Sequence, residues 1–137
     1  MERIKKLLEA FRGLQARIRE LKTAHRAVAA EIAVMPDGDD KAAKDAKKAE
    51  EAEIASKRLT AREELAKTLR EARKAIDVQT SLAADAATVD ALGFYAHEMS
   101  IPMKRLKSKM AVLCRKEASS HRRRRRARWA RRHRKTA

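Results

Sequence analysis

Apolar side chains recur at alternating intervals of three and four residues from the start of the chain to residue 35. This spacing places them on one face of an α-helix, and its persistence over about four heptads is typical of coiled coils. Only His25 interrupts the pattern. We therefore expect a helix over residues 2–35 whose apolar stripe needs a packing partner. The stripe consists of Ile4, Leu7, Phe11, Leu14, Ile18, Leu21, Val28, Ile32 and Met35.

Residues 36–40, Pro-Asp-Gly-Asp-Asp, are all turn formers, and Asp39 or Asp40 could cap a following helix. Residues 41–92 contain neither Gly nor Pro and are rich in Ala, Lys, Glu, Arg and Leu, the residues with the highest helix propensity. We expect a second helix here that packs antiparallel to the first as a coiled-coil-like hairpin. Its expected apolar positions are Ala52, Ala55, Leu59, Leu65 or Ala66, Leu69, Ala72 and Ile76.

The apolar stripe changes register near residues 77–82. Thr80, Ser81 and Thr88 are candidates for a bend or a new N-cap, and one continuous helix with a stutter is the alternative. The sequence does not distinguish one helix from two over residues 41–100. The apolar positions after the shift are Val78, Leu82, Ala86, Val89, Leu92, Ala96 and Met99.

The same stripe continues beyond Pro102, a residue that removes one backbone hydrogen bond from a helix. Either a helix is kinked at Pro102, or a new helix starts there with Ser100 as its N-cap and Pro102 in its first turn. The apolar positions of this third helical segment are Met103, Leu106, Met110 and Leu113. We interpret them and Met99 as a packing face rather than as an adaptable binding groove.

The fold class that these patterns predict is all-α. Three Gly and two Pro in 137 residues are too few for a protein built of strands and tight turns. We expect a long antiparallel helical hairpin, a third helix that Pro102 either kinks or begins, and an arginine-rich C-terminal extension. In domain terms, residues 1–118 form a helical hairpin or bundle and residues 119–137 form a basic tail that is disordered when it has no partner.

Charge is divided unequally along the chain, whose net charge is +16. Residues 1–102 hold 19 Lys and Arg against 18 Asp and Glu, whereas residues 103–137 hold 16 against the single acid Glu117. Such a segregation of charge indicates a polyanionic partner. Nucleic acid is the first candidate, and an anionic membrane surface or an acidic protein tail is the second.

The basic residues of the C-terminal part are the candidate nucleic-acid contacts. Arginine outnumbers lysine nine to one in residues 119–137, and its planar guanidinium suits bidentate contacts with phosphate. A nuclear localisation signal or a solvated tail would have the same composition. The candidates are Lys104, Arg105, Lys107, Lys109, Arg115, Lys116, Arg122, Arg123, Arg124, Arg125, Arg126, Arg128, Arg131, Arg132, Arg134 and Lys135.

Trp129, the only tryptophan, lies among these arginines. It joins the candidates because an aromatic ring in a basic segment can stack on the unpaired bases of RNA. The alternative is that Trp129 packs against this protein or a neighbour.

Catalytic and cofactor sites are not expected. The possible metal ligands are Cys114 and the four histidines, His25, His97, His121 and His133, and they lack the spacing of a zinc site. The chain also has no glycine-rich phosphate loop and no apolar pocket that would tune a carboxyl group. We expect no enzyme activity, no cofactor, no metal and no small-molecule substrate.

The sequence predicts an intracellular protein without a membrane span. No stretch approaches the roughly 20 apolar residues that a spanning helix needs, and a single cysteine leaves no intrachain disulfide. The basic, amphipathic N-terminus resembles a mitochondrial presequence in composition, but Glu2, Glu9 and Glu20 argue against one. The ribosome of the cytoplasm or of the mitochondrion is the expected location, with the nucleus or nucleolus as alternatives.

The charge distribution and the periodicity of the sequence indicate structural RNA binding as the function. A nearly neutral helical body with a basic extension suits a component of a large ribonucleoprotein particle, foremost a ribosomal protein anchored to ribosomal RNA and to neighbouring proteins. DNA compaction by the arginine-rich tail is an alternative. A coiled-coil or cytoskeletal scaffold whose tail binds acidic protein surfaces is another.

Overall fold

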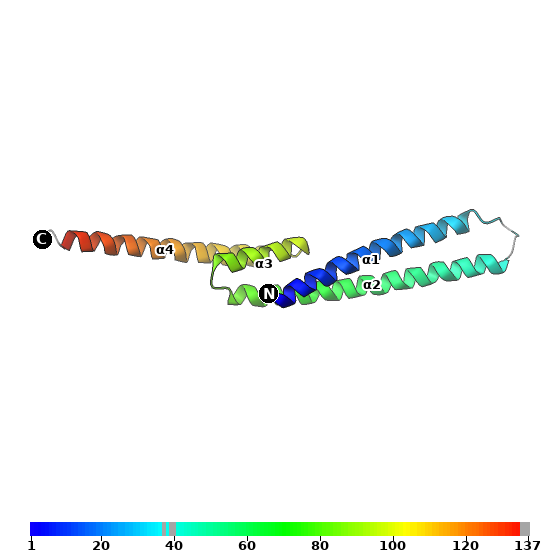
Figure 1. The fold of residues 1–137 in the computed structure, drawn as a ribbon, viewed down its shortest axis with the longest axis horizontal. Coiled ribbons are helices and arrows are strands. Elements are labelled where there is room, and N and C mark those ends of the chain that lie inside the picture. The colour runs from blue at the N-terminus through cyan, green and yellow to red at the C-terminus, as the bar shows by residue number, and fades with distance from the viewer. Residues whose placement is uncertain (37, 39–40, 135–137) are drawn as a thin grey trace. The chain divides into compact units, whose positions relative to one another are not determined.

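The protein is all-α. The computed structural model describes residues 1–36, 38 and 41–134, and this part of the chain forms four helices and no strand (Figure 1). The helices are α1 (Glu2–Ala33), α2 (Lys41–Leu82), α3 (Ala86–Glu98) and α4 (Lys104–Arg134). The expected caps Asp39 and Asp40 lie outside the described residues. The chain divides into two compact units, Glu2–Ala72 and Arg73–Ala137, with Met1 grouped with the second.

In the unit Glu2–Ala72, α1 lies beside the first part of α2 (Figure 1), and polar contacts join the two helices. Nζ of Lys47 lies 2.7 Å from Oε2 of Glu31, and this hydrogen bond and charge raise the pKa of Lys47. Nε2 of His25 lies 3.3 Å from Oε1 of Glu51. Glu31 follows His25 in α1, whereas its partner Lys47 precedes Glu51, the partner of His25, in α2. The two helices therefore run in opposite directions at these contacts. Coiled-coil packing between them stays a prediction.

The buried positions of this unit differ in part from the predicted stripe. Ile4, Phe11 and Val28 of α1 are buried as expected, and Leu8 is buried although the pattern did not include it. The prediction for α2 was wrong at Ala52, Ala55 and Leu59, which are exposed. Its inward face instead carries Ile54, Arg58 and Ala61, of which Ala61 is buried, and of the predicted alternatives Leu65 is half-buried whereas Ala66 is exposed. Alanine occurs on every face of α2, so alanine spacing does not reveal which face is covered.

Gly13 offers a direct test of the helical assignment in α1. A Cβ atom added at Gly13 would meet nothing within 4 Å, and glycine costs about 1 kcal/mol relative to alanine inside a helix. We expect Gly13→Ala to raise the free energy of unfolding by up to about 1 kcal/mol in urea titrations. Gly38→Ala is the matched control, because the φ of +97° at Gly38 is strained for alanine. A destabilised Gly13→Ala variant would contradict the helix.

In the unit Arg73–Ala137, α2 ends at Leu82 and a separate helix follows. Residues 41–100 therefore form two helices rather than one. The N-cap of α3 is Asp85, whose Oδ1 accepts a hydrogen bond of 2.7 Å from the backbone N–H of Thr88. The predicted caps Thr80 and Ser81 were wrong, because their hydroxyls bond to carbonyls four residues earlier inside α2. Thr88 belongs to α3 and donates to the cap instead of being it.

The Asp85 cap predicts a pH dependence of stability. Its hydrogen bonds from Thr88 hold the pKa of the carboxyl below its ordinary value of 3.8. Folding thus favours the charged form, so the stabilisation is complete above the unfolded pKa and is lost as pH falls through the lower folded pKa. Asp85→Asn keeps an oxygen acceptor without a titrating group. Urea unfolding from pH 6 to pH 2.5 should show wild type losing stability relative to this variant below about pH 4; parallel profiles would exclude the cap.

The turn between α3 and α4 corrects the expectation for Ser100. The N–H groups of Ser100 and Ile101 donate to the carbonyls of His97 and Ala96, at 3.1 and 2.8 Å, and Ser100 has a φ of +54°. This pattern is a Schellman motif, which ends a helix. Ser100 therefore follows the C-terminus of α3 and is not the N-cap of α4, since an N-cap has an extended backbone. Pro102 precedes α4, so it kinks no helix.

The apolar stripes of α3 and α4 are buried where the two helices lie side by side (Figure 1). Val89, Leu92, Ala96 and Met99 are buried from the α3 side, and Leu106 and Leu113 from α4, as predicted. Val78 and Leu82 were predicted wrongly, because they are 56% and 72% exposed. At the end of α2 the buried positions are Ile76 and Thr80. Thr80 is polar, so a pattern of apolar residues does not include it. Its hydroxyl donates to the carbonyl of Ile76 at 2.7 Å, so the buried hydroxyl group has a hydrogen-bond partner.

The basic C-terminal part is helical as far as Arg134, and disorder of residues 119–137 in the absence of a partner stays a prediction. Residues 119–134 continue α4 without a break. Alanine and arginine both have high helix propensity, and α4 carries cations in its last turn, where they interact favourably with the helix dipole.

Candidate nucleic-acid interface

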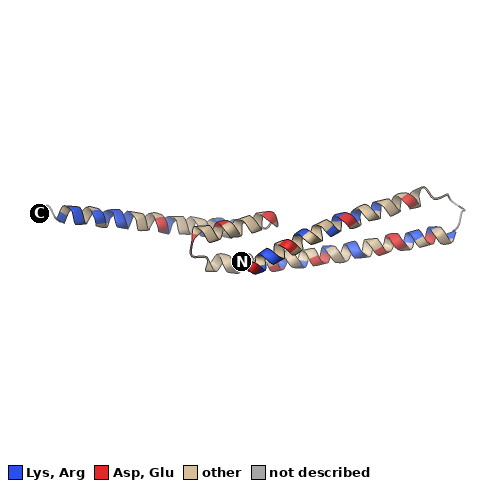
Figure 2. Cartoon of the chain, viewed as in Figure 1, with Lys and Arg blue, Asp and Glu red and all other residues tan. Residues whose placement is uncertain are grey.

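Helix α4 consists of a packed part and a fully exposed part. Leu113 is its last buried residue, and every residue from Cys114 to Trp129 is exposed. The exposed part contains what we call the arginine segment, residues 122–134, in which nine of 13 residues are arginine. Figure 2 shows an almost unbroken band of basic residues there, whereas basic and acidic residues alternate along α1 and α2. The arginine segment is therefore a solvent-exposed rod of positive charge.

The arginines of the segment are all exposed. Their proximity along one helix makes many pairs of like charge at intervals of three and four residues, for example Arg122 with Arg126 and Arg124 with Arg128. Each such pair destabilises a helix by about 0.2–0.5 kcal/mol. Phosphates placed between the guanidinium groups would replace this repulsion by attraction. The site is thus chemically suited to a polyanion. Lys135, also predicted, lies outside the described residues.

Trp129 is 63% exposed and stacks on His133, the residue one helical turn later. The ring centroids lie 4.0 Å apart with an angle of 25° between the planes. Nδ1 of His133 also lies 2.9 Å from the carbonyl oxygen of Trp129. The histidine holds the indole ring on the surface of α4. The spacing of four residues between Trp129 and His133 could have revealed this pair in the sequence.

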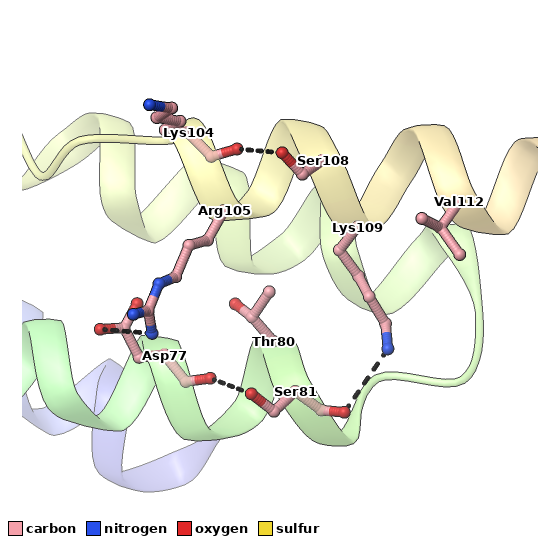
Figure 3. A pocket seen from close by; sticks show the side chains of 8 residues that line it. All are labelled: Asp77, Thr80, Ser81, Lys104, Arg105, Ser108, Lys109 and Val112. Atoms are coloured by element: carbon pink, nitrogen blue, oxygen red, sulfur yellow. Dashed lines mark hydrogen bonds and ion pairs between the residues drawn. The ribbon is translucent and has the colours of Figure 1, made fainter.

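Two of the predicted basic residues have partners at the end of α2. Nη1 of Arg105 lies 3.6 Å from Oδ2 of Asp77, and Nζ of Lys109 donates to the carbonyl oxygen of Ser81 at 3.5 Å (Figure 3). The two cations lie four residues apart on one face of α4, above a shallow pocket that α2 and α4 line together. The sequence does not reveal Asp77 and Ser81 as partners of Arg105 and Lys109, because only the packing of α4 on α2 brings these residues close together. Arg105 and Lys109 thus each have a polar contact with the end of α2.

The structure does not bring the remaining predicted cations of α4 into one cluster. Lys104, Lys107, Arg115 and Lys116 are exposed at intervals along the helix. Arg105 remains 76% exposed despite its contact, and an ion pair between groups as exposed as Arg105 and Asp77 contributes little to stability. The arginine segment therefore dominates the candidate interface, and the basic residues before it form a weaker extension.

No other candidate site emerges from the described part of the chain. Cys114, His97, His121 and His133 are exposed, and His25 is half-buried. Among the residues described, no group of three or more His, Cys, Asp or Glu is placed to hold a metal ion. The described helices also include none that is both long enough and apolar enough to cross a membrane.

Comparisons of this chain with known protein families, with curated proteins and with solved structures gave no match.

Proposed function

We propose that this protein is a structural RNA-binding component of a large ribonucleoprotein particle, foremost a ribosome, and that it anchors to ribosomal RNA through the arginine segment. The observation that supports the proposal is the exposure of every arginine in residues 122–134, a part of α4 that contains no acidic residue. A helix with this charge gains stability from a polyanion, and counterion release would drive the binding.

Residues 1–102, which are nearly neutral, are proposed to contact proteins of the particle. In this proposal α1 and the first part of α2 form a coiled-coil-like antiparallel hairpin, supported by the contacts of Glu31 with Lys47 and of His25 with Glu51. Their balanced charge gives them little affinity for phosphate. A ribosome of the cytoplasm or the mitochondrion is the favoured particle, and a nuclear or nucleolar one is the alternative.

Two alternative functions would use some of the same structural features. DNA compaction would use the same arginines, but a compaction protein would benefit from positive charge throughout, and residues 1–102 are close to neutral. A scaffold whose basic tail binds acidic proteins would use the helical pair equally well. RNA is favoured over acidic protein because arginine predominates and its fork matches the geometry of phosphate.

The experiment that tests RNA binding is a titration of the full chain with an RNA hairpin that has a paired stem and an unpaired loop. If about six to ten cations neutralise phosphates, the logarithm of the binding constant should fall against the logarithm of salt concentration with a slope of about −4 to −9. A slope near zero would refute phosphate anchoring. Tighter binding to an acidic peptide of equal charge would favour the scaffold.

Trp129→Ala separates base stacking from charge. The substitution removes no charge, and a stacked base contributes about 1–3 kcal/mol. We expect weaker binding to the hairpin by that amount with an unchanged salt slope, because the exposed indole ring would lose its contact with an unpaired loop base. Trp129→Phe is the control that retains an aromatic ring. Unchanged affinity of the alanine variant would reduce the segment to a purely electrostatic contact.

A further inference from the structure

The arginines of the arginine segment surround α4 instead of lying on one face. An α-helix has 3.6 residues per turn, so successive side chains are rotated by about 100°. The nine arginines then leave no gap wider than about 60° around the helix axis. The nine are Arg122, Arg123, Arg124, Arg125, Arg126, Arg128, Arg131, Arg132 and Arg134, and all of them are exposed. A helix that lay against a single strand of phosphates could use only the arginines on one side.

The density of positive charge along the helix also favours contact with more than one strand of phosphates. Arg122 and Arg134 are separated by about 18 Å at a rise of 1.5 Å per residue, so the segment carries one cation per roughly 2 Å. A nucleic-acid duplex presents about one phosphate per 1.7 Å of its axis when both strands are counted, but only one per 3.4 Å on each strand. One strand would thus leave much of the positive charge unpaired, whereas two strands would match it.

From these two observations we propose that the arginine segment binds as a helix flanked on opposite sides by the two phosphate strands of a double-stranded region. This inference rests on the proposed function and specifies its target. The width of an α-helix with its side chains, about 10–12 Å, equals that of the major groove of B-form DNA. The major groove of regular A-form RNA is narrow, so in RNA the target is a helix widened by an internal loop.

The chain contains two matched pairs of arginines that test this geometry. Arg125 and Arg132 project on one side of α4, and Arg123 and Arg134 project on the opposite side, at an angle of about 160–180°. None of these four side chains is buried. The double variants Arg125→Gln with Arg132→Gln and Arg123→Gln with Arg134→Gln each remove two charges. Glutamine retains high helix propensity, and circular dichroism of the full chain checks that both variants keep the same helix content.

Each variant and wild type are titrated with three probes of equal length: an RNA duplex with an internal loop, a DNA duplex and single-stranded RNA. We expect both variants to lower the salt slope on a duplex by about 1.4–1.8, with similar losses of affinity, and wild type to prefer a duplex over the single strand. Preference for the RNA duplex agrees with the proposed function, whereas preference for the DNA duplex would contradict that function and favour DNA binding.

Two results would overturn the inference while leaving the proposed function intact. One is a loss of affinity confined to a single pair of arginines, which would show that only one face of α4 binds. The other is equal or tighter binding to single-stranded RNA. Failure of wild type to bind any of the three probes would instead refute the proposed function itself.

Discussion

Deletion of residues 119–137 is expected to lower the affinity for RNA by about a thousandfold or more at 0.1 M salt. The deleted residues contain ten of the 16 basic residues that follow Pro102. The electrostatic contribution to binding grows with the number of phosphates neutralised, so most of the salt dependence should disappear with the affinity. Fluorescence anisotropy of a labelled RNA hairpin at several salt concentrations measures both quantities.

A charge-preserving variant is the control for this deletion. Replacement of Arg122–Arg126 by lysine keeps every charge but removes the planar guanidinium groups. We expect it to retain the salt slope and to lose a modest part of the affinity through its bidentate contacts. The truncated chain should still fold, because the last buried residue of α4 is Leu113. If the truncated chain bound RNA as tightly as wild type, the arginine segment would not be the interface.

Leu92→Ala is expected to destabilise the unit Arg73–Ala137 by about 2–5 kcal/mol. Leu92 has no exposed surface and lies on the stripe of α3 that is buried beside α4. Its truncation removes apolar contacts and leaves a cavity that the helices fill only in part. Chemical denaturation followed by circular dichroism measures the change, and the slope against denaturant shows whether the transition keeps its cooperativity.

Leu59→Ala provides the comparison with the same chemical change on α2. Leu59 is 60% exposed, so its truncation should alter the free energy of unfolding by no more than about 0.5 kcal/mol. The sequence pattern assigned both leucines to apolar stripes, and only the structure separates them. Equal losses of stability in the two variants would show that the packing described for α2 or α3 is incorrect.

The sequence predicted the helices well where bulky apolar residues mark one face. Phe11, Val89, Leu92, Leu106 and Leu113 are all buried at positions that the spacing selected. The prediction of buried positions failed where the residue types on the buried and exposed faces of a helix are similar. Alanine is abundant on every face of α2, and a polar residue, Thr80, occupies a buried position there because its hydroxyl bonds to the backbone. The cap of α3 was also predicted incorrectly, because Asp85, which was not among the candidates, accepts the hydrogen bond from Thr88.

The candidate interface was predictable as a set of residues but not as an arrangement. Charge counting alone identified the arginines of residues 122–134. It could not show that they surround a helix, since repulsion between them argued for disorder. Nor could it show that Arg105 and Lys109 contact Asp77 and Ser81, because those contacts depend on how α4 packs against the end of α2.

Nuclease treatment of a native extract, followed by size fractionation, tests the central claim most directly. The protein should migrate with a large particle before treatment, and digestion of RNA should release it into the low-mass fractions. Deoxyribonuclease serves as the control and should leave the particle intact, since release by that enzyme alone would point to DNA. If the protein remained in a large assembly after all nucleic acid was digested, the ribonucleoprotein account would be contradicted and a protein scaffold would replace it.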